Sequence, residues 1–386
     1  MDFIVPKLYH STMTKVAILI PTMNRPDFIL RQFEFYELMN SPHPIYVLDS
    51  SNPENADKLK KEIKKFKKLS IIYQWAPPGK DCLYQLLPQV KEKYCIQMGD
   101  DDLLIPSTMS ECADFLEKNP DYATCAGKQI NFSFQKKNYN KPYGIIERQT
   151  LPHGRSLEDD NMLARVKEFW FDLKINNSEV SIRNVAFICF VVRSVELEKS
   201  IRNVTKYFSL TEHILEFLST SILVISGKFK VLDKLGYVMQ KSSNRYSFTH
   251  SLTVDVVTDP NMSSQWAIAH KEFAEIIREK GYTEEEGLKI AKWIFVLYLA
   301  RQFTLETDWP PVTQTIGHFK STPTRPTSAR LGRGLFKKAR YFVSRWPLLE
   351  SIYYKYHPTN DATRPESKYF NDFKVVKDFL EKNHND

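Results

Sequence analysis

Three consecutive carboxylic acids, Asp100, Asp101 and Asp102, follow the short apolar segment 94–98. Adjacent carboxylates repel one another, so a fold gains no stability from gathering them at the end of a buried strand. A bound divalent cation removes that cost, and Mg²⁺ or Mn²⁺ commonly joins one or two carboxylates to the oxygens of a diphosphate. The acids therefore predict a site for a metal and a nucleotide diphosphate. A solvated loop is the alternative.

Two further polar segments also come directly after apolar runs. The segment 21–26, with the sequence PTMNRP, follows the run 16–20, and Asp49 with two serines follows the run 45–48. Because the carboxyl ends of parallel strands meet at the edge of a sheet where ligands bind, we expect the polar segments to lie together. Each of these two is a weak signal alone, since a turn or a helix cap also explains it.

Apolar runs alternate with segments of helical spacing in the first third of the chain. We predict strands at 16–20, 45–48, 70–74, 94–98 and 122–126, with helices at 26–40, 52–68, 81–92 and 106–118. This alternation indicates βαβ units with right-handed crossovers, hence an α/β fold with a mainly parallel sheet. Further along we predict a polar loop at 136–156, helices at 157–173, 206–221 and 263–306, and strands at 184–193 and 229–239.

The order of these motifs resembles the family 2 glycosyltransferases of the GT-A type. The resemblance covers residues 14–245 and is carried by VAILIPTMNRP, YVLDSS and CIQMGDDDLLIP, while GKFKVLDKLGYVMQ resembles a bacterial subgroup tied to surface polysaccharide. It implies a Rossmann-like GT-A domain and a nucleotide-sugar donor, most simply UDP-linked. It also implies a divalent cation (Mn²⁺ or Mg²⁺), a glycan or lipid-linked acceptor, and inversion at the anomeric carbon by direct displacement.

The resemblance also implies roles for single residues. Thr22, Asn24 and Arg25 stand where the first loop of the family meets the nucleotide. Asp49 matches an acid that contacts the base or ribose, although the family usually has two acids there. Lys80 stands where a basic residue approaches the nucleotide, with compressed spacing.

The three adjacent acids cover the DXD motif of that family. Alignment on the segment 103–106 favours Asp101 as the central metal ligand, whereas a strict D-x-D pattern favours Asp100 and Asp102. We assign Asp100 to the nucleotide and Asp101 and Asp102 to the metal, and the choice among the three stays open at this point.

An acceptor hydroxyl needs a general base, and in the resembled family this acid opens a helix well past the DXD motif. Glu212 fits that position, with His213 in place of the usual second acid. Glu212 would take the proton as the hydroxyl attacks the anomeric carbon. The alternative is an ordinary first-turn acid favoured by the helix dipole. A rival acidic cluster at 158–160 is more simply explained as a helix cap.

Composition places the chain among globular proteins, with 386 residues, 42% hydrophobic and 26% charged. At about 150 residues per domain we expect two or three domains: a GT-A domain over 1–250, a helical extension over 251–320, and a linker, basic amphipathic helix and polar tail over 321–386.

No apolar run approaches the roughly 20 residues of a spanning helix. The five cysteines show no CxxC spacing, which favours reduced thiols in a cytoplasmic protein.

The net charge of +8 is concentrated in two segments. Residues 58–68 hold seven lysines and one glutamate, and residues 321–349 hold seven basic residues and no acid. Within 330–346, apolar side chains recur at helical spacing among the basic ones, which is typical of a helix lying on an anionic membrane, here the inner face of the cell membrane. Packing on the protein itself or on a second copy of the chain is the alternative.

Other classes of protein are disfavoured by missing motifs. The chain has no GxxxxGK[ST], GxGxxG, GxSxG or HExxH sequence, which argues against P-loop NTPases, dinucleotide dehydrogenases, common hydrolases and zinc proteases. Nucleic acid is not expected as a partner, because the lysine-rich segment 58–68 offers a single aromatic ring for base stacking. The alternative function is a non-catalytic nucleotide-sugar-binding or scaffold protein in polysaccharide assembly.

Overall fold

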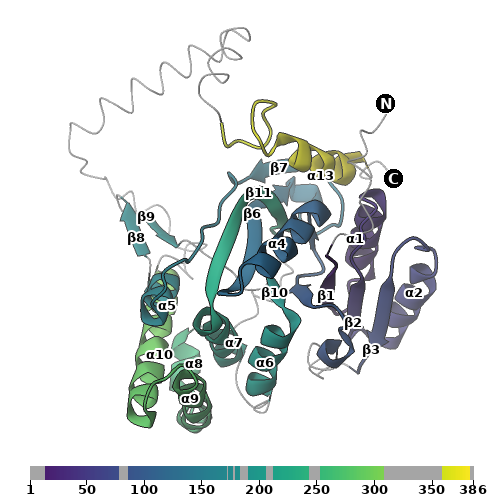
Figure 1. The fold of residues 1–386 in the computed structure, drawn as a ribbon. Helices are drawn as coiled ribbons and strands as arrows, with labels where there is room; N and C mark the ends of the chain where they lie inside the picture. Colours follow the sequence, from purple (N-terminus) through teal and green to yellow (C-terminus); the bar gives the residue numbers. More distant parts are fainter. Residues whose placement is uncertain are drawn as a thin grey trace, which may run out of the picture.

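The structure is a computed structural model that describes residues 14–77, 86–171, 173–176, 179–182, 190–205, 212–242, 253–307 and 359–382. A nine-stranded sheet runs through it in the order β3-β2-β1-β4-β10-β6-β11-β5, and β7 pairs with β6 beside this path (Figure 1). The strands are β1 (Val16–Thr22), β2 (Ile45–Asp49), β3 (Ile71–Trp75), β4 (Tyr94–Gln97), β5 (Asp102–Leu104), β6 (Tyr122–Phe134), β7 (Ile146–Gln149), β10 (Val191–Arg193) and β11 (Lys228–Gln240).

Most of this sheet is parallel, as predicted. The strands β1 to β4 pair in parallel, and so do β6 and β11. The short strands β5, β7 and β10 run antiparallel to their neighbours. The predicted α/β class and the predicted strands at 16–20, 45–48, 70–74, 94–98, 122–126 and 229–239 are confirmed.

Strand β1 shows why both faces of the sheet are covered. Its first five residues, 16–20, are inaccessible to solvent. Successive side chains of a strand point to opposite faces, and accordingly Val16, Ile18 and Ile20 join one apolar cluster while Ala17 and Leu19 join the other. An uninterrupted apolar run is therefore what a parallel strand covered on both faces requires.

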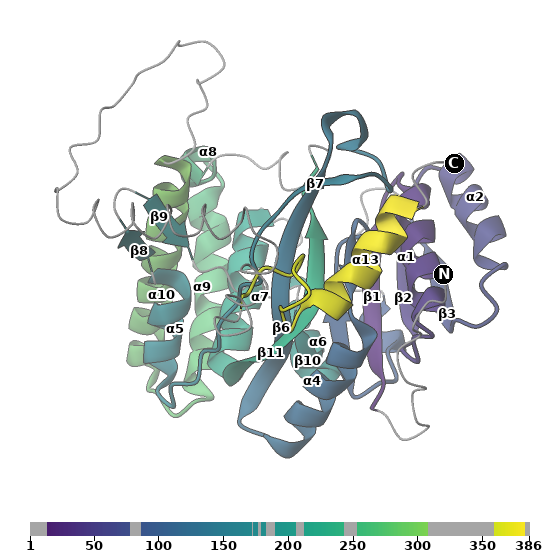
Figure 2. The ribbon, with the colours of Figure 1, turned by 90° about the horizontal axis from the view of Figure 1, so that it is seen from above.

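Helices cover the two faces of the sheet. The apolar cluster on one face includes α1 (Pro26–Leu38), α4 (Pro106–Lys118) and α13 (Phe370–Lys382), and the other includes α5 (Met162–Phe171), α7 (Glu212–Ser226), α9 (Met262–Arg278) and α10 (Glu284–Thr307). Figure 2 shows these groups on opposite sides of the sheet. The remaining elements are α2 (Pro53–Ile63), α6 (Ser194–Thr205), α8 (Thr253–Thr258), the 3₁₀ turns η1 (Leu87–Gln89) and η2 (Lys136–Asn138), and the hairpin β8 (Leu173–Asn176) with β9 (Glu179–Ile182).

The helix predicted over 263–306 is two helices, α9 and α10. Gly281 lies between them with a φ of +94°, a backbone conformation that a residue with a side chain rarely adopts. Thr283 and Glu286 then form a capping box. The Thr283 N–H donates to the Glu286 carboxylate over 2.8 Å, and the Thr283 hydroxyl accepts from the Glu286 N–H over 3.3 Å. Residues 278–287 hold Tyr282 as their single apolar side chain, and the prediction carried one helical spacing from Ile277 to Ile290 across this polar stretch.

Two other segments differ from the prediction. Strand β6 continues to Phe134, and its second half pairs with β7 inside the predicted polar loop 136–156. Strand β7 is an edge strand with mainly exposed polar side chains, so it carries no apolar signal. The segment 194–205 forms α6, which the sequence pattern did not predict, directly after β10.

The C-terminal segment is not the polar tail predicted for the end of 321–386, because it contains α13. Phe373, Val376, Phe379 and Leu380 of α13 are buried, and the Phe379 ring packs against Phe35 of α1 with centroids 5.4 Å apart. Charged residues on its other face gave the segment its polar appearance. The helix predicted at 330–346 lies outside the described residues, and the division into three domains stays a prediction.

No helix within the described ranges is both long enough and apolar enough to cross a bilayer.

Candidate functional site

Polar side chains meet at the carboxyl ends of four neighbouring strands. Thr22 ends β1, Asp49 ends β2 and Trp75 ends β3, and the three residues are direct partners in the register of the sheet. The acids follow β4, which is the other neighbour of β1. The Thr22 hydroxyl donates to Asp100 Oδ2 over 2.8 Å and so joins the acidic segment to this row. The expectation that the polar segments lie together is confirmed.

Arg25 stands at the start of α1 and reaches the first two acids. Its Nη1 donates to Asp100 Oδ1 over 2.7 Å, and its Nη2 donates to Asp101 Oδ2 over 3.1 Å. The guanidinium lies over the ring of Phe28, with its central carbon 4.1 Å from the ring centroid. Asp100 and Asp101 are each 6% exposed, and two adjacent carboxylates this deeply buried need such a paired positive charge.

Opposing influences act on the pKa of Asp100. Burial raises the pKa of the Asp100 carboxyl to about 6, the Arg25 guanidinium opposes the rise, and the charge of Asp101 adds to it. A further positive charge beside the pair would favour the ionised form of Asp100. With both acids ionised, the two carboxylates and the single guanidinium of Arg25 leave one net negative charge at this position.

Asp102 points into the protein instead. It is the first residue of β5, is 4% exposed, and lies opposite β11. Its Oδ1 accepts a hydrogen bond from the backbone N–H of Gln240 over 2.9 Å, and its Oδ2 accepts one from the Tyr237 hydroxyl. Both carboxylate oxygens are thus used within the fold. Of the three predicted acids, Asp100 and Asp101 are the two turned toward Arg25.

Two buried residues of α1 hold the backbone of the acidic segment from behind. Arg31 Nη2 donates to the carbonyl of Asp101 over 2.6 Å. Gln32 Nε2 donates to the carbonyls of Gly99 and Asp102, each over 2.8 Å. Both side chains are inaccessible to solvent. Neither was predicted as a site residue; the available signal was a pair of polar residues within an apolar helical segment.

Asp49 shapes the turn after β2. It is inaccessible to solvent, and its two oxygens accept hydrogen bonds from the Ser51 N–H over 2.8 Å and from the Tyr73 hydroxyl over 2.7 Å. The Ser51 hydroxyl in turn accepts from the Asn24 N–H over 2.7 Å. Asn24 has a φ of +57°, a left-handed conformation that asparagine tolerates. Two predicted residues, Asn24 and Asp49, are therefore linked, and their partners Ser51 and Tyr73 were not predicted.

Two large apolar side chains remain exposed at the same edge. Met23 is 50% exposed and Trp75 is 37% exposed. Trp75 Nε1 donates to the carbonyl of Ser51 over 2.9 Å, which fixes the indole beside the end of β2. Apolar surface next to a few well-placed polar groups is the usual composition of a small-molecule site. Trp75 was not predicted; as the last residue of an apolar strand it has no motif of its own.

Two predicted residues, Lys80 and Glu212, lie wholly or in part outside the described residues. Lys80 lies outside the described residues. Glu212 is the first described residue of α7, directly after the undescribed segment 206–211, and its side chain is outside the described part of the chain. Its role as a general base stays a prediction.

The rival acidic cluster at 158–160 belongs to the opposite edge of the sheet. Two of its carboxylates pair with Lys228 and Lys230, at the amino end of β11. The cap of α5 is the side chain of Asn161, which accepts from two backbone N–H groups of this helix over 2.9 and 3.1 Å. The cluster therefore has a structural role and no connection with Arg25 and its acids.

The residues present fit a divalent cation that is shared with a diphosphate. Within the described ranges, no group of three or more Asp, Glu, His or Cys side chains forms a complete metal site. One or two carboxylates are sufficient, however, for Mg²⁺ or Mn²⁺ when phosphate oxygens supply further ligands. Asp100 and Asp101 provide two, and Asp101 Oδ1 accepts no hydrogen bond from the described residues. That oxygen lies 3.1 Å from the position that a Cβ on Gly99 would take, so glycine leaves it room.

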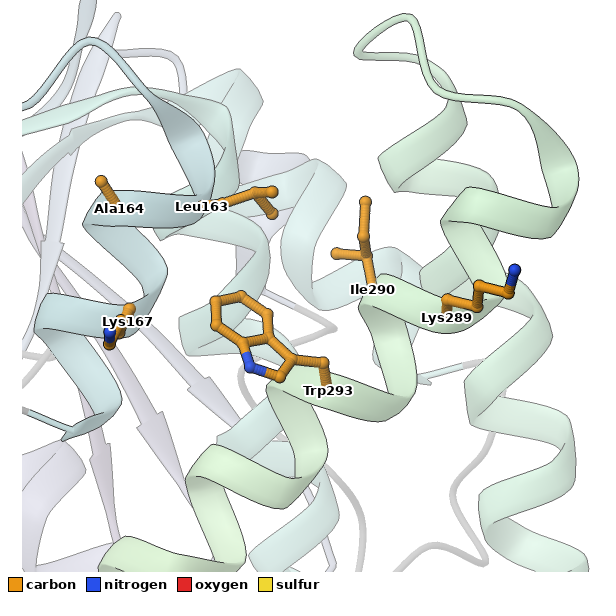
Figure 3. Close-up of a pocket in the computed structure, with 6 residues that line it drawn as sticks. All are labelled: Leu163, Ala164, Lys167, Lys289, Ile290 and Trp293. Carbon is orange, nitrogen blue, oxygen red and sulfur yellow. The ribbon is translucent and has the colours of Figure 1, made fainter.

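A separate surface pocket of about 420 Å³ lies between α5 and α10. It is lined by Leu163, Ala164, Lys167, Lys289, Ile290 and Trp293 (Figure 3). None of these residues belongs to the sheet edge, and no carboxylate lines the pocket. It is therefore distinct from the predicted site.

No protein-family model matches the sequence, and no curated protein does. Among solved structures, residues 1–349 of S. aureus TarS are 12% identical, with 77% of this chain and 92% of that chain covered and a TM-score of 0.41. The same TarS fragment in complex with UDP-GlcNAc is 10% identical, with 77% and 91% covered and a TM-score of 0.41. A mannosyltransferase, PcManGT from Pyrobaculum calidifontis in complex with GDP-Man and Mn²⁺, is 10% identical, with 77% and 80% covered and a TM-score of 0.38. Similarity at this level does not assign an activity to the present chain.

Proposed function

We propose that this chain is a glycosyltransferase that moves a sugar from a nucleotide-sugar, which we take to be UDP-linked, to a hydroxyl of a glycan or lipid-linked acceptor. One observation carries the proposal. Two buried carboxylates, Asp100 and Asp101, converge with Arg25 and Thr22 at the carboxyl edge of a parallel sheet. That edge is where open α/β sheets bind ligands. The sequence resemblance to family 2 glycosyltransferases, with inversion at the anomeric carbon, agrees with this reading.

The two ends of this sheet edge differ in a way that suits a nucleoside diphosphate, with an aromatic ring at one end and a positive charge at the other. From β3 to β4 the sheet crosses three strand spacings of about 4.8 Å, so the edge from Trp75 to Asp100 spans roughly 14 Å. The β3 end offers the exposed indole of Trp75, a surface for a base. The β1 and β4 end offers the guanidinium of Arg25, which can donate two parallel hydrogen bonds to phosphate oxygens. We therefore place the base near Trp75 and the diphosphate near Arg25.

Asp100 and Asp101 would hold the divalent cation, Mn²⁺ or Mg²⁺, together with the diphosphate. When bound, the cation supplies positive charge that offsets the charge developing on the departing diphosphate. Thr22 keeps Asp100 oriented through its 2.8 Å hydrogen bond. Asp102 supports the site indirectly, because its bonds to β11 fix the backbone that carries the other two acids.

The acceptor hydroxyl must lose a proton as its oxygen attacks the anomeric carbon. We propose Glu212 for this role: its carboxylate takes the proton, the new carbon–oxygen bond forms, and the bond to the diphosphate oxygen breaks. The proposal rests on the sequence resemblance, and Glu212 is the first described residue of α7.

Release of nucleotide from a panel of UDP-sugars and GDP-sugars tests the proposed function. A glycosyltransferase is expected to release the nucleotide slowly from its own donor in the presence of Mn²⁺ or Mg²⁺, even when water is the only acceptor. The non-catalytic alternative, a nucleotide-sugar-binding or scaffold protein, would bind a nucleotide and release none from any sugar. A chain that binds no nucleotide at all would exclude both functions.

A further inference from the structure

Among the described residues, Arg25 is the basic side chain that forms ion pairs with both acids at the ligand edge. Its guanidinium spans the pair, with one nitrogen on Asp100 and the other on Asp101. Its side chain is 21% exposed. The other arginine near the acids, Arg31, is inaccessible to solvent and donates to backbone and side-chain carbonyl oxygens. Arg25 is thus accessible to a ligand at the surface of the site. Arg31 lies beneath the site and holds the backbone of the acidic segment.

The position of Arg25 conflicts with that of a cation on the same carboxylates. A guanidinium and a divalent cation repel each other strongly at contact distance, and one oxygen of each acid is already engaged by Arg25. A diphosphate, on the other hand, is a better partner for a guanidinium fork than two separate carboxylates. A diphosphate that binds together with a divalent cation therefore brings a cation that competes with Arg25 for the acids. It also brings phosphate oxygens that can accept hydrogen bonds from Arg25.

Phe28 gives the guanidinium a support that does not depend on the acids. The central carbon of Arg25 lies 4.1 Å above the ring centroid, a stacking distance for a cation on an aromatic face. A planar group can turn over a flat ring without losing this contact. Arg25 can therefore change hydrogen-bond partners while its head stays at the sheet edge.

We propose that Arg25 is an exchangeable internal cation of this site. In the free protein it holds Asp100 and Asp101 together. When a nucleotide diphosphate binds with its divalent cation, the cation takes the two carboxylates and Arg25 transfers its two N–H groups to the phosphate oxygens. This inference rests on the proposed function, in that the ligand is a nucleotide diphosphate bound with a metal.

Two binding measurements on the full chain test the exchange, neither of which needs turnover. Mn²⁺ is titrated alone and followed by electron paramagnetic resonance, and UDP is then titrated calorimetrically at saturating Mn²⁺. Arg25→Met removes the competing charge, so its affinity for Mn²⁺ alone should rise about tenfold or more, while its affinity for UDP should fall about tenfold. Arg25→Lys keeps the charge without the fork, so both effects should be smaller.

A matched control comes from a neighbouring ion pair. Lys58 pairs with Asp27 over 2.8 Å on the exposed surface, and Lys58→Met should change neither affinity. Far-UV circular dichroism of each variant on heating shows whether it is folded.

The opposite signs of the two effects make the inference refutable. If Arg25→Met is folded and binds both Mn²⁺ and UDP more weakly, Arg25 is a fixed clamp that shapes the acids, and the exchange is wrong. Unchanged Mn²⁺ affinity in Arg25→Met overturns it equally. If the wild-type chain binds UDP but holds no Mn²⁺ even in the presence of UDP, or binds neither, the proposed metal-dependent function itself fails and the exchange falls with it.

Discussion

His43 should make the stability of the protein depend on pH between about 6.5 and 4. The imidazole is 1% exposed. Its Nδ1 accepts from the Val16 N–H over 3.1 Å, and its Nε2 lies 3.0 Å from the Pro106 carbonyl, so the neutral ring joins β1 to the start of α4. Burial lowers the pKa of His43 from 6.5 to about 4, and the charge of Lys15 lowers it further. The hydrogen bond to Pro106 works against this shift.

The sign and size follow from proton binding. Below pH 6.5 the unfolded chain binds a proton at His43 while the folded chain does not, so the free energy of unfolding falls as the pH is lowered through this range. The difference between 6.5 and about 4, at about 1.36 kcal/mol per pH unit, amounts to about 3 kcal/mol, complete near pH 4. Above pH 6.5 both states are neutral and His43 has no such effect.

The assay compares wild type with His43→Gln in urea unfolding at pH 7.5, 6, 5 and 4.5. Glutamine can accept from Val16 and donate to Pro106 but does not titrate. The comparison also cancels Asp100, whose raised pKa of about 6 acts with the opposite sign, stabilising the folded state as the pH falls toward 3.8. Wild type should lose stability on acidification relative to His43→Gln. Parallel curves for the two proteins would show that the folded chain protonates His43 readily, and the reasoning would be refuted.

Three further predictions concern the function. Glu212→Gln should lower transfer by about 10²–10⁴-fold with donor affinity unchanged; if donor affinity collapses while turnover per bound donor survives, Glu212 is a structural residue. Trp75→Ala should weaken UDP by about tenfold, since stacking on a base contributes about 1–3 kcal/mol, while leaving inorganic pyrophosphate binding unchanged; equal loss of both ligands would place the base elsewhere. The full chain should bind anionic vesicles in a salt-sensitive way, and neutralising Lys337, Lys338 and Arg340 should abolish this, whereas binding by both proteins or by neither would remove the proposed membrane contact at 330–346. A truncation before this segment would not serve, because it would also remove α13 from the core.

The elements found from the sequence are those with a strong local pattern. The run 16–20 is apolar throughout because β1 is buried on both faces, and Pro26 and Pro106 mark the first residues of α1 and α4. Strand β7 was missed because it is exposed and polar, and α13 because charged residues separate its buried ones. A local sequence pattern indicates which residues are buried. Strand β7 has few buried residues, and in α13 the buried residues are separated by charged ones.

For the site, the sequence predicted the residues that belong to motifs and missed the residues that support them. The acids and the segment 21–26 each carry a motif, and topology brings motifs at strand ends to one edge. The residues that hold these acids in place belong to no motif. Tyr237 and Gln240 of β11 donate hydrogen bonds to Asp102 and lie more than a hundred positions away in the sequence. The distinction between Asp101 and Asp102 depends on this pairing, so no local pattern could make it.

The most direct test of the proposed function is metal-dependent release of UDP by wild type and Asp101→Asn. Asn keeps the size of the side chain and a hydrogen-bond acceptor for Arg25 but removes the charge that would hold the cation. Asp57→Asn, on the exposed face of α2, is the matched control. Wild type and Asp57→Asn should release UDP from at least one UDP-sugar with Mn²⁺ or Mg²⁺ and none in excess EDTA, and Asp101→Asn, folded as judged by circular dichroism, should release none. Undiminished release by Asp101→Asn, or full release in EDTA, would contradict the assignment of these acids and the mechanism built on them.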